Sequence, residues 1–203
     1  MRTSDPAADL KGWLAAPTVK PHEISQFLDT LIHAARVAAI RSLNRTEQRK
    51  LYEAVDGFRP LALSDLVPAT YEDLATVRHF GKNTLPVFSY FEKRFCRPVG
   101  ANRDHPAELL GFNFQTMAPV TGPGYFVAVD DEARQEVVVD YRRVPEEHPD
   151  GWPPIKDNER GLSRLVYGFL VDTLRGVSEH VAIGSAARKG KDLGSWFVLC
   201  REQ

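Results

Sequence analysis

The sequence predicts an α+β domain: an antiparallel sheet of about five strands, a long helix packed across one face of it, and an N-terminal helical segment. Apolar residues recur every three or four positions through much of 18–98, which indicates helices that face a core. In 109–203, alternating or short apolar runs indicate strands, interrupted by one longer helical pattern. The connections between the strand-like runs are short and rich in turn residues, which favours antiparallel neighbours.

Two regions precede the predicted sheet. Residues 1–17 are rich in Ala, Pro and Asp and predict a loose lead-in, so that a single α+β domain covers 18–203. A core-facing helix is predicted from Pro21, because proline suits the first turn of a helix. A second helix is predicted after the cap candidate Thr46, and it ends at Gly57.

The stretch RHFGKNTLP (78–86) pairs Gly and Lys shortly before a hydroxyl residue, as the end of a phosphate-binding P-loop does. It lacks the upstream glycine of that motif, and Asn83 separates Lys82 from the hydroxyl. The stretch therefore predicts a junction between two helices. Gly81 ends a helix over 71–79, and the next helix covers about 85–95.

This junction is the predicted anion site. Arg78, Lys82 and Asn83 would hold a phosphate or carboxylate against the free N–H groups that begin the next helix. The alternative is a plain connection whose charges are solvated. The wider segment 78–97 holds five basic residues and one acidic residue, with Phe and Tyr between them. It favours a surface for single-stranded nucleic acid or lipid, or else an ordinary amphipathic helix that buries its phenylalanines.

The second part of the chain consists of strand-like runs around one long helical pattern. Strands are predicted at LLGFNFQTM (109–117), YFVAV (125–129), EVVVDY (136–141), HVAIGSA (180–186) and SWFVLC (195–200). An apolar stripe after the cap candidate Asn158 predicts the long helix, which extends to about residue 177.

Polar residues on these later elements add candidate ligand contacts. Asp140 and Arg142 share one face of a predicted strand and become a binding pair if that face is covered. Asp172 and Arg175 are three residues apart on the predicted helix, with Arg175 as the anion ligand. For each of these residues, a routine surface or helix-end charge is the alternative.

Acid–base catalysis has three candidate residues: His79, His180 and Asp172. The short motifs that mark serine hydrolases, zinc proteases, dinucleotide-binding enzymes and zinc deaminases are missing from the sequence. The histidines and the two cysteines fall in no metal-ligand spacing, so the sequence predicts no metal and no cofactor.

Composition limits the partners and the compartment. A net charge of -1 gives no field that would recruit double-stranded nucleic acid. The uncharged stretch 109–129 alternates and contains Pro and Gly, so it predicts strands and no transmembrane segment. No signal-peptide pattern is present, and Cys96 and Cys200 are predicted as buried thiols, which together favour a cytoplasmic location.

The function predicted first is a non-catalytic module that binds a small amphipathic or anionic molecule. An antiparallel sheet with many aromatic residues commonly leaves an apolar pocket at one end. Two alternatives stay open at this point. One is an enzyme that acts on a small anionic substrate, and the other is an assembly subunit that uses the 85–95 helix. A homo-oligomer is compatible with all three.

Overall fold

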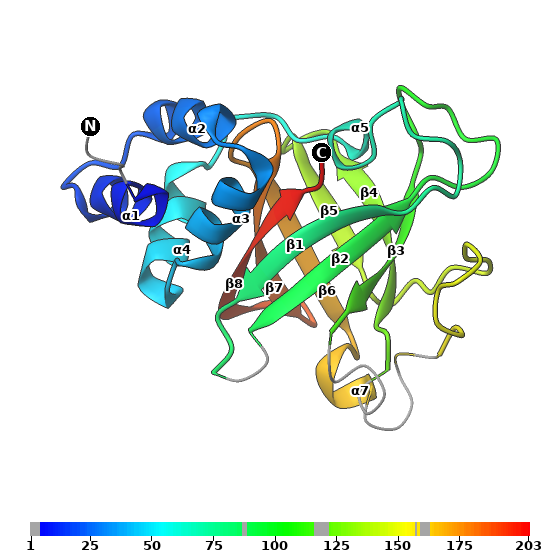
Figure 1. Ribbon diagram of the computed structural model, residues 1–203. Helices are drawn as coiled ribbons and strands as arrows, with labels where there is room; N and C mark the ends of the chain where they lie inside the picture. Colours follow the sequence, from blue (N-terminus) through cyan, green and yellow to red (C-terminus); the bar gives the residue numbers. More distant parts are fainter. Residues whose placement is uncertain (1–4, 87–88, 116–121, 157, 159–162) are drawn as a thin grey trace.

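The fold is a closed barrel of eight antiparallel strands with helices packed against its outside (Figure 1). The computed structural model describes residues 5–86, 89–115, 122–156, 158 and 163–203. Each strand pairs with the next along the chain, and the first also pairs with the last, which closes the barrel. The strands are β1 (Val77–Asn83), β2 (Tyr90–Cys96), β3 (Leu109–Phe114), β4 (Tyr125–Asp131), β5 (Glu136–Asp140), β6 (Leu170–Gly176), β7 (Val181–Arg188) and β8 (Lys191–Arg201).

Most of the helices precede the barrel in the chain. These are α1 (Pro6–Ala15), α2 (Pro21–Thr30), α3 (His33–Arg41), α4 (Arg45–Ala54) and α5 (Leu63–Leu66), whereas α7 (Ser163–Val166) lies between β5 and β6. None of those in the described ranges is both long enough and apolar enough to cross a membrane.

The predicted open sheet with a long helix across it was wrong. The sequence of β2 shows why, because Phe91, Lys93 and Phe95 alternate with the less buried Glu92 and Arg94. Phe91 and Phe95 are also four residues apart, the spacing of a helix face, so a local pattern fits both structures. The barrel interior buries one alternate set, and this tertiary context selects the strand.

The predicted long helix is replaced by the short α7 and by strand β6. Phe169 separates the two, and its φ of 59° lies in the left-handed region that a continuing helix does not use. Leu170, Asp172 and Leu174 then alternate along β6, where each pairs with β7. Residues 159–162 of the predicted helix lie outside the described residues.

Gly81 lies in the middle of β1 and does not end a helix, which corrects the predicted helical junction. Its role is close packing inside the barrel. A Cβ placed on Gly81 would lie 2.8 Å from the ring of Phe91 and 2.9 Å from Leu199. The absence of a side chain therefore lets two large neighbours meet over β1.

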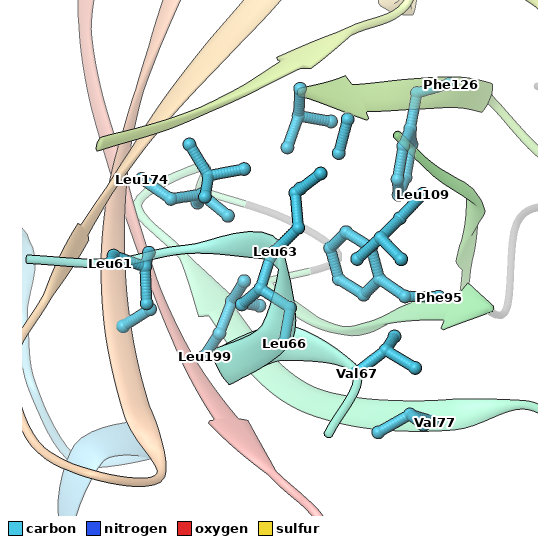
Figure 2. Close-up of a cluster of buried hydrophobic side chains, with 14 of the residues drawn as sticks. Leu61, Leu63, Leu66, Val67, Val77, Phe95, Leu109, Phe126, Leu174 and Leu199 are labelled. Atoms are coloured by element: carbon cyan, nitrogen blue, oxygen red, sulfur yellow. The ribbon is translucent and has the colours of Figure 1, made fainter. Parts of the chain in front are cut away.

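One end of the barrel is closed by α5 and the chain around it. Leu61, Leu63, Leu66 and Val67 are buried in the interior core. Figure 2 shows them among side chains of the strands, which include Val77, Phe95, Leu109, Phe126, Leu174 and Leu199. Figure 1 places α5 at this end and α7 at the opposite end. The α5 end is therefore filled by apolar side chains.

A second core lies outside the barrel, between the N-terminal helices and strands β7 and β8. Leu10 and Leu14 of α1 are buried in it together with Val198 and Cys200 of β8. Residues 6–15 thus form a packed helix, which corrects the predicted loose lead-in (1–17) for this part of the chain. The single helix predicted from Pro21 is two helices, because the backbone is extended at their junction.

The strands predicted at 125–129, 136–141, 180–186 and 195–200 are confirmed, and so is most of the strand at 109–117. Its last two residues lie outside the described residues. Cys96 and Cys200 are both buried free thiols. Burial raises the pKa of the Cys96 thiol to about 12 and that of Cys200 to about 11, so both are poor nucleophiles.

Candidate functional site

The end of the barrel near α7 contains a cavity of about 320 Å³. Its walls come from the ends of six strands, together with residues beside β5 and in and after α7. The apolar part of the wall includes Phe91, Val166, Tyr167, Leu170, Leu193, Trp196 and Phe197. Pockets of this size with apolar walls and a few polar groups are typical of small-molecule sites.

Four polar side chains converge at the deep side of this cavity, and we call them the Lys93 cluster: Lys93, Asn113, Tyr141 and Asp172. Each is between 1 % and 7 % exposed. They come from β2, β3, the residue after β5, and β6, so barrel closure alone brings them together. The barrel interior places them beside the apolar core that fills the α5 end.

Lys93 is the centre of the cluster. Its Nζ donates to Asp172 Oδ2 at 2.9 Å and to Asn113 Oδ1 at 3.2 Å, and it also bonds the Tyr141 hydroxyl. The Nζ lies 4.9 to 5.0 Å from the ring centres of Phe126, Tyr141 and Phe197. These rings remove water from the ammonium group, and their electron-rich faces partly stabilise its charge.

Tyr141 and Asp172 complete the network. The Tyr141 hydroxyl accepts a bond of 2.8 Å from Asn113 Nδ2 and donates to Asp172 Oδ2 at 3.2 Å. Both bonds to the carboxylate therefore end on Oδ2. The other carboxylate oxygen, Oδ1, accepts no hydrogen bond from the residues that the structure describes. Asp172 lines the cavity, and Oδ1 is the carboxylate oxygen that keeps its capacity to accept a hydrogen bond.

Burial dominates the electrostatics of the cluster. Loss of solvent lowers the pKa of Lys93, and the nearby Asp172 carboxylate only partly opposes this. The same loss raises the pKa of Asp172, against the effect of Lys93, and raises the pKa of Tyr141. Transfer of a proton from Lys93 to Asp172 therefore costs less free energy than it would in a solvated ion pair. Such balanced groups beside a cavity are typical of functional sites.

His79 points into the barrel interior at the α5 end, away from the cavity. Its Nε2 lies 2.9 Å from the carbonyl oxygen of Leu66, and its ring meets Phe95 edge-on. Burial lowers the pKa of His79 to about 3, so the imidazole is neutral and its Nε2–H donates to Leu66. The residue joins α5 to β1, and a catalytic role for it stays a prediction.

We expect His79→Gln to reduce the loss of stability in acid. The unfolded histidine binds a proton below about pH 6.5 while the folded one stays neutral until about pH 3, so stability is lost as the pH falls through this window. At about pH 5 this loss amounts to about 2 kcal/mol. Urea unfolding at about pH 7 and about pH 5 measures it. His22→Gln, at an exposed position, is the control. An unchanged acid response in His79→Gln would contradict the assignment.

His180 lies near His79 but not near the cations predicted to accompany it. Both histidines border a space of about 10 Å³, which is large enough for about one water molecule. Arg201 Nη2 lies 3.0 Å from His180 Nδ1. Asp172, the third candidate for acid–base chemistry, is in the Lys93 cluster. The predicted catalytic set is thus divided between the two ends of the barrel.

The predicted anion site around β1 is also divided. Arg78 forms a bidentate pair with Glu92 on the outside of the barrel, with distances of 2.7 and 3.1 Å. Lys82 lies over the ring of Tyr90, 6.0 Å from its centre. Asn83 alone lines the cavity. Arg78 and Lys82 lie on the outer face of β1, whereas Asn83 points to the opposite face, so the three side chains do not converge.

The remaining predicted ligand contacts lie in ion pairs with their neighbours. Arg142 pairs with Asp140 through two bonds of 2.8 Å at the end of β5. Arg175 bonds Glu136 at 2.6 Å and Asp56 at 2.9 Å, which ties β6 to β5 and to the chain after α4. Their binding roles stay predictions, and their contacts explain how the outer surface of the barrel is held together.

Sequence reasoning missed Lys93 and Asn113 as site residues, and it expected Tyr141 only as an aromatic residue of the pocket wall. One signal was available, because Lys93 stands between Phe91 and Phe95 in a run whose alternate residues are apolar. A charged residue on the apolar face of a strand is costly to bury unless it has a partner, and so it indicates one. The partner, Asp172, is 79 positions away and cannot be identified from local pattern.

Two further findings bear on the site. Among the described residues, no group of three or more His, Cys, Asp or Glu side chains is placed to hold a metal ion. No protein-family model, no curated protein and no solved structure matches this chain, so the geometry of the barrel and its cavity carries the functional argument.

Proposed function

We propose that this protein binds a small, largely apolar molecule in the barrel cavity, with one neutral polar group of that molecule against the Lys93 cluster. The observation that carries this proposal is the cavity of about 320 Å³, which has largely apolar walls and the polar Lys93 cluster on one side. An apolar surface of this kind releases water when a ligand covers it, and the polar end fixes the orientation of the ligand.

The volume limits the size of the ligand. A water molecule in the liquid takes about 30 Å³, so the cavity corresponds to roughly ten such molecules. A molecule of about ten non-hydrogen atoms therefore fits. Phenyl-substituted and medium-chain alcohols or carbonyl compounds have this size.

At the Lys93 cluster, charge favours a neutral head group over the anionic one suggested by the sequence. The positive charge of Lys93 is matched by Asp172 at 2.9 Å. A carboxylate bound at the same end would meet the Asp172 carboxylate in a site of low dielectric, where like charges repel strongly. A hydroxyl can instead donate to Asp172 Oδ1 without bringing a further charge.

We expect hydrocinnamyl alcohol and nonanol to bind the protein and raise its melting temperature, whereas hydrocinnamate binds far more weakly. At a free concentration of about 100 times Kd, a ligand specific for the folded state adds about 2.7 kcal/mol of stability. Isothermal calorimetry and thermal unfolding with all three compounds measure the difference.

Ala186→Phe is the variant that tests the position of this site, because Ala186 lines the cavity on β7. The added ring fills part of the ligand space, and we expect it to weaken alcohol binding at least tenfold, which is about 1.4 kcal/mol. Ala133→Phe, in the exposed turn between β4 and β5, is the matched control. Absence of alcohol binding to the wild type, or equal binding to Ala186→Phe, would overturn the proposal.

A further inference from the structure

We propose that Lys93 is a covalent ligand-binding residue: its Nζ condenses reversibly with the carbonyl carbon of an aldehyde held in the barrel cavity. This inference rests on the proposed function and names a reactive class within it. Lys93 lines the cavity, and its neighbours Tyr141 and Asp172 line it too. An aldehyde that enters with its apolar part against the cavity wall therefore brings its polar end to the amine.

The first requirement for this chemistry is an uncharged amine. Asp172 Oδ2, at 2.9 Å from Nζ, accepts the proton of the ammonium group without help from solvent. Burial among aromatic rings lowers the pKa of Lys93 and raises that of Asp172, which brings the neutral pair closer in free energy to the ion pair. Lysines made nucleophilic by an apolar surrounding are a known route to Schiff bases.

The residues of the cluster take up and supply every proton that the condensation moves. After the proton moves from Nζ to Asp172, the nitrogen lone pair attacks the carbonyl carbon, and the π electron pair of the carbonyl moves to its oxygen. One proton from nitrogen and the proton held by Asp172 end on that oxygen, which leaves as water. The products are a protonated imine, R–CH=NH⁺–Lys93, one water molecule and an ionised Asp172. No oxidant, reductant or further reactant is consumed.

The charge of the cluster favours this product over other lysine modifications. The protonated imine keeps the single positive charge beside Asp172, at the position where the ammonium stood. Acylation of Lys93 would instead remove that charge and leave a buried carboxylate without its counter-ion, which costs several kcal/mol. The low exposure of Lys93, 1 % of its surface, also keeps bulk water away from the imine and slows its hydrolysis.

The test uses hydrocinnamaldehyde with cyanoborohydride, which reduces an imine to a stable secondary amine. Intact mass and peptide mapping then locate the adduct. We expect one dominant adduct at Lys93 in the folded protein, with at least tenfold higher occupancy than at any exposed lysine. An excess of hydrocinnamyl alcohol, which has the same shape without the carbonyl, should suppress it by occupying the cavity.

Three results separate the proposals. An adduct at Lys93 that the alcohol suppresses supports the covalent role. Alcohol binding by calorimetry without an adduct at Lys93, or with adducts spread over exposed lysines, overturns the covalent role and leaves the proposed function standing. Binding of neither compound overturns both. The double variant Lys93→Met/Asp172→Asn removes the amine and its counter-ion together, and it should not form the dominant adduct.

Discussion

Replacing Lys93 with methionine is expected to lower the free energy of unfolding by about 3–5 kcal/mol. The methionine fills a similar volume, so the loss comes from charge and not from a cavity. Asp172 would remain 3 % exposed without its ion-pair partner at 2.9 Å. The buried carboxylate must then either stay charged at a high cost or take up a proton at neutral pH. Urea unfolding followed by circular dichroism measures the change.

The double variant Lys93→Met/Asp172→Asn provides the control for this result. It removes both charges and keeps an amide that can bond the Tyr141 hydroxyl, which lies 3.2 Å from Asp172 Oδ2. We expect it to be more stable than Lys93→Met alone, because replacing a whole buried pair is often close to neutral. If the double variant is less stable than the single one, the two residues do not act as a coupled pair.

Replacing Phe95 with alanine is expected to lower the free energy of unfolding by about 3–5 kcal/mol. Phe95 is fully buried at the α5 end, where its ring meets those of Phe126 and His79 at centre distances of 5.2 and 4.9 Å. Strand β2 cannot collapse into the space that is left, because both of its neighbours hold it by regular pairing. Thermal and chemical unfolding measure the effect.

Phe114→Ala is the matched control for Phe95→Ala, because the same side chain is removed from the next strand. Phe114 is 46 % exposed, and its ring stacks on the guanidinium of Arg94, 4.0 Å away. We expect a loss of about 1 kcal/mol or less. Similar losses at the two positions would contradict the placement of the interior core.

The strands that fold as tight hairpins could be predicted from the sequence, whereas barrel closure could not. EVVVDY has several adjacent β-branched residues and follows a polar turn, so helix spacing does not compete there. In β6, by contrast, Leu170 and Leu174 fit a helix stripe and a strand face equally well. The left-handed backbone at Phe169 ends the helix and so selects the strand. This conformation could not be predicted from the residue type, because phenylalanine rarely adopts it.

The candidate site could be predicted from the sequence only in part. The sequence identified Asp172 as a chemically interesting residue but assigned it to Arg175 and His180, its neighbours along the chain. On a strand Asp172 faces the interior and Arg175 faces out, where it pairs with Glu136. Its hydrogen-bond partners are Lys93 on β2 and Tyr141 after β5, and the approach of Lys93 depends on the closure of the barrel. A pocket at one end of the sheet was predicted, and the cavity is there, with Tyr141 and Tyr167 among its aromatic residues.

The pairing of β1 with β8 also determines when the molecule can fold. His79 pairs with Arg201, and the backbone N–H of Arg78 donates to the carboxylate of Glu202 at 2.7 Å. The helices α1 to α4 share a buried core with Val181, Ile183 and Val198, which belong to the last two strands. During synthesis, apolar surface of the N-terminal helices therefore stays exposed until residues near 201 leave the ribosome. Contacts between such distant parts of a chain make folding slow, and the exposed apolar surface favours aggregation during that interval.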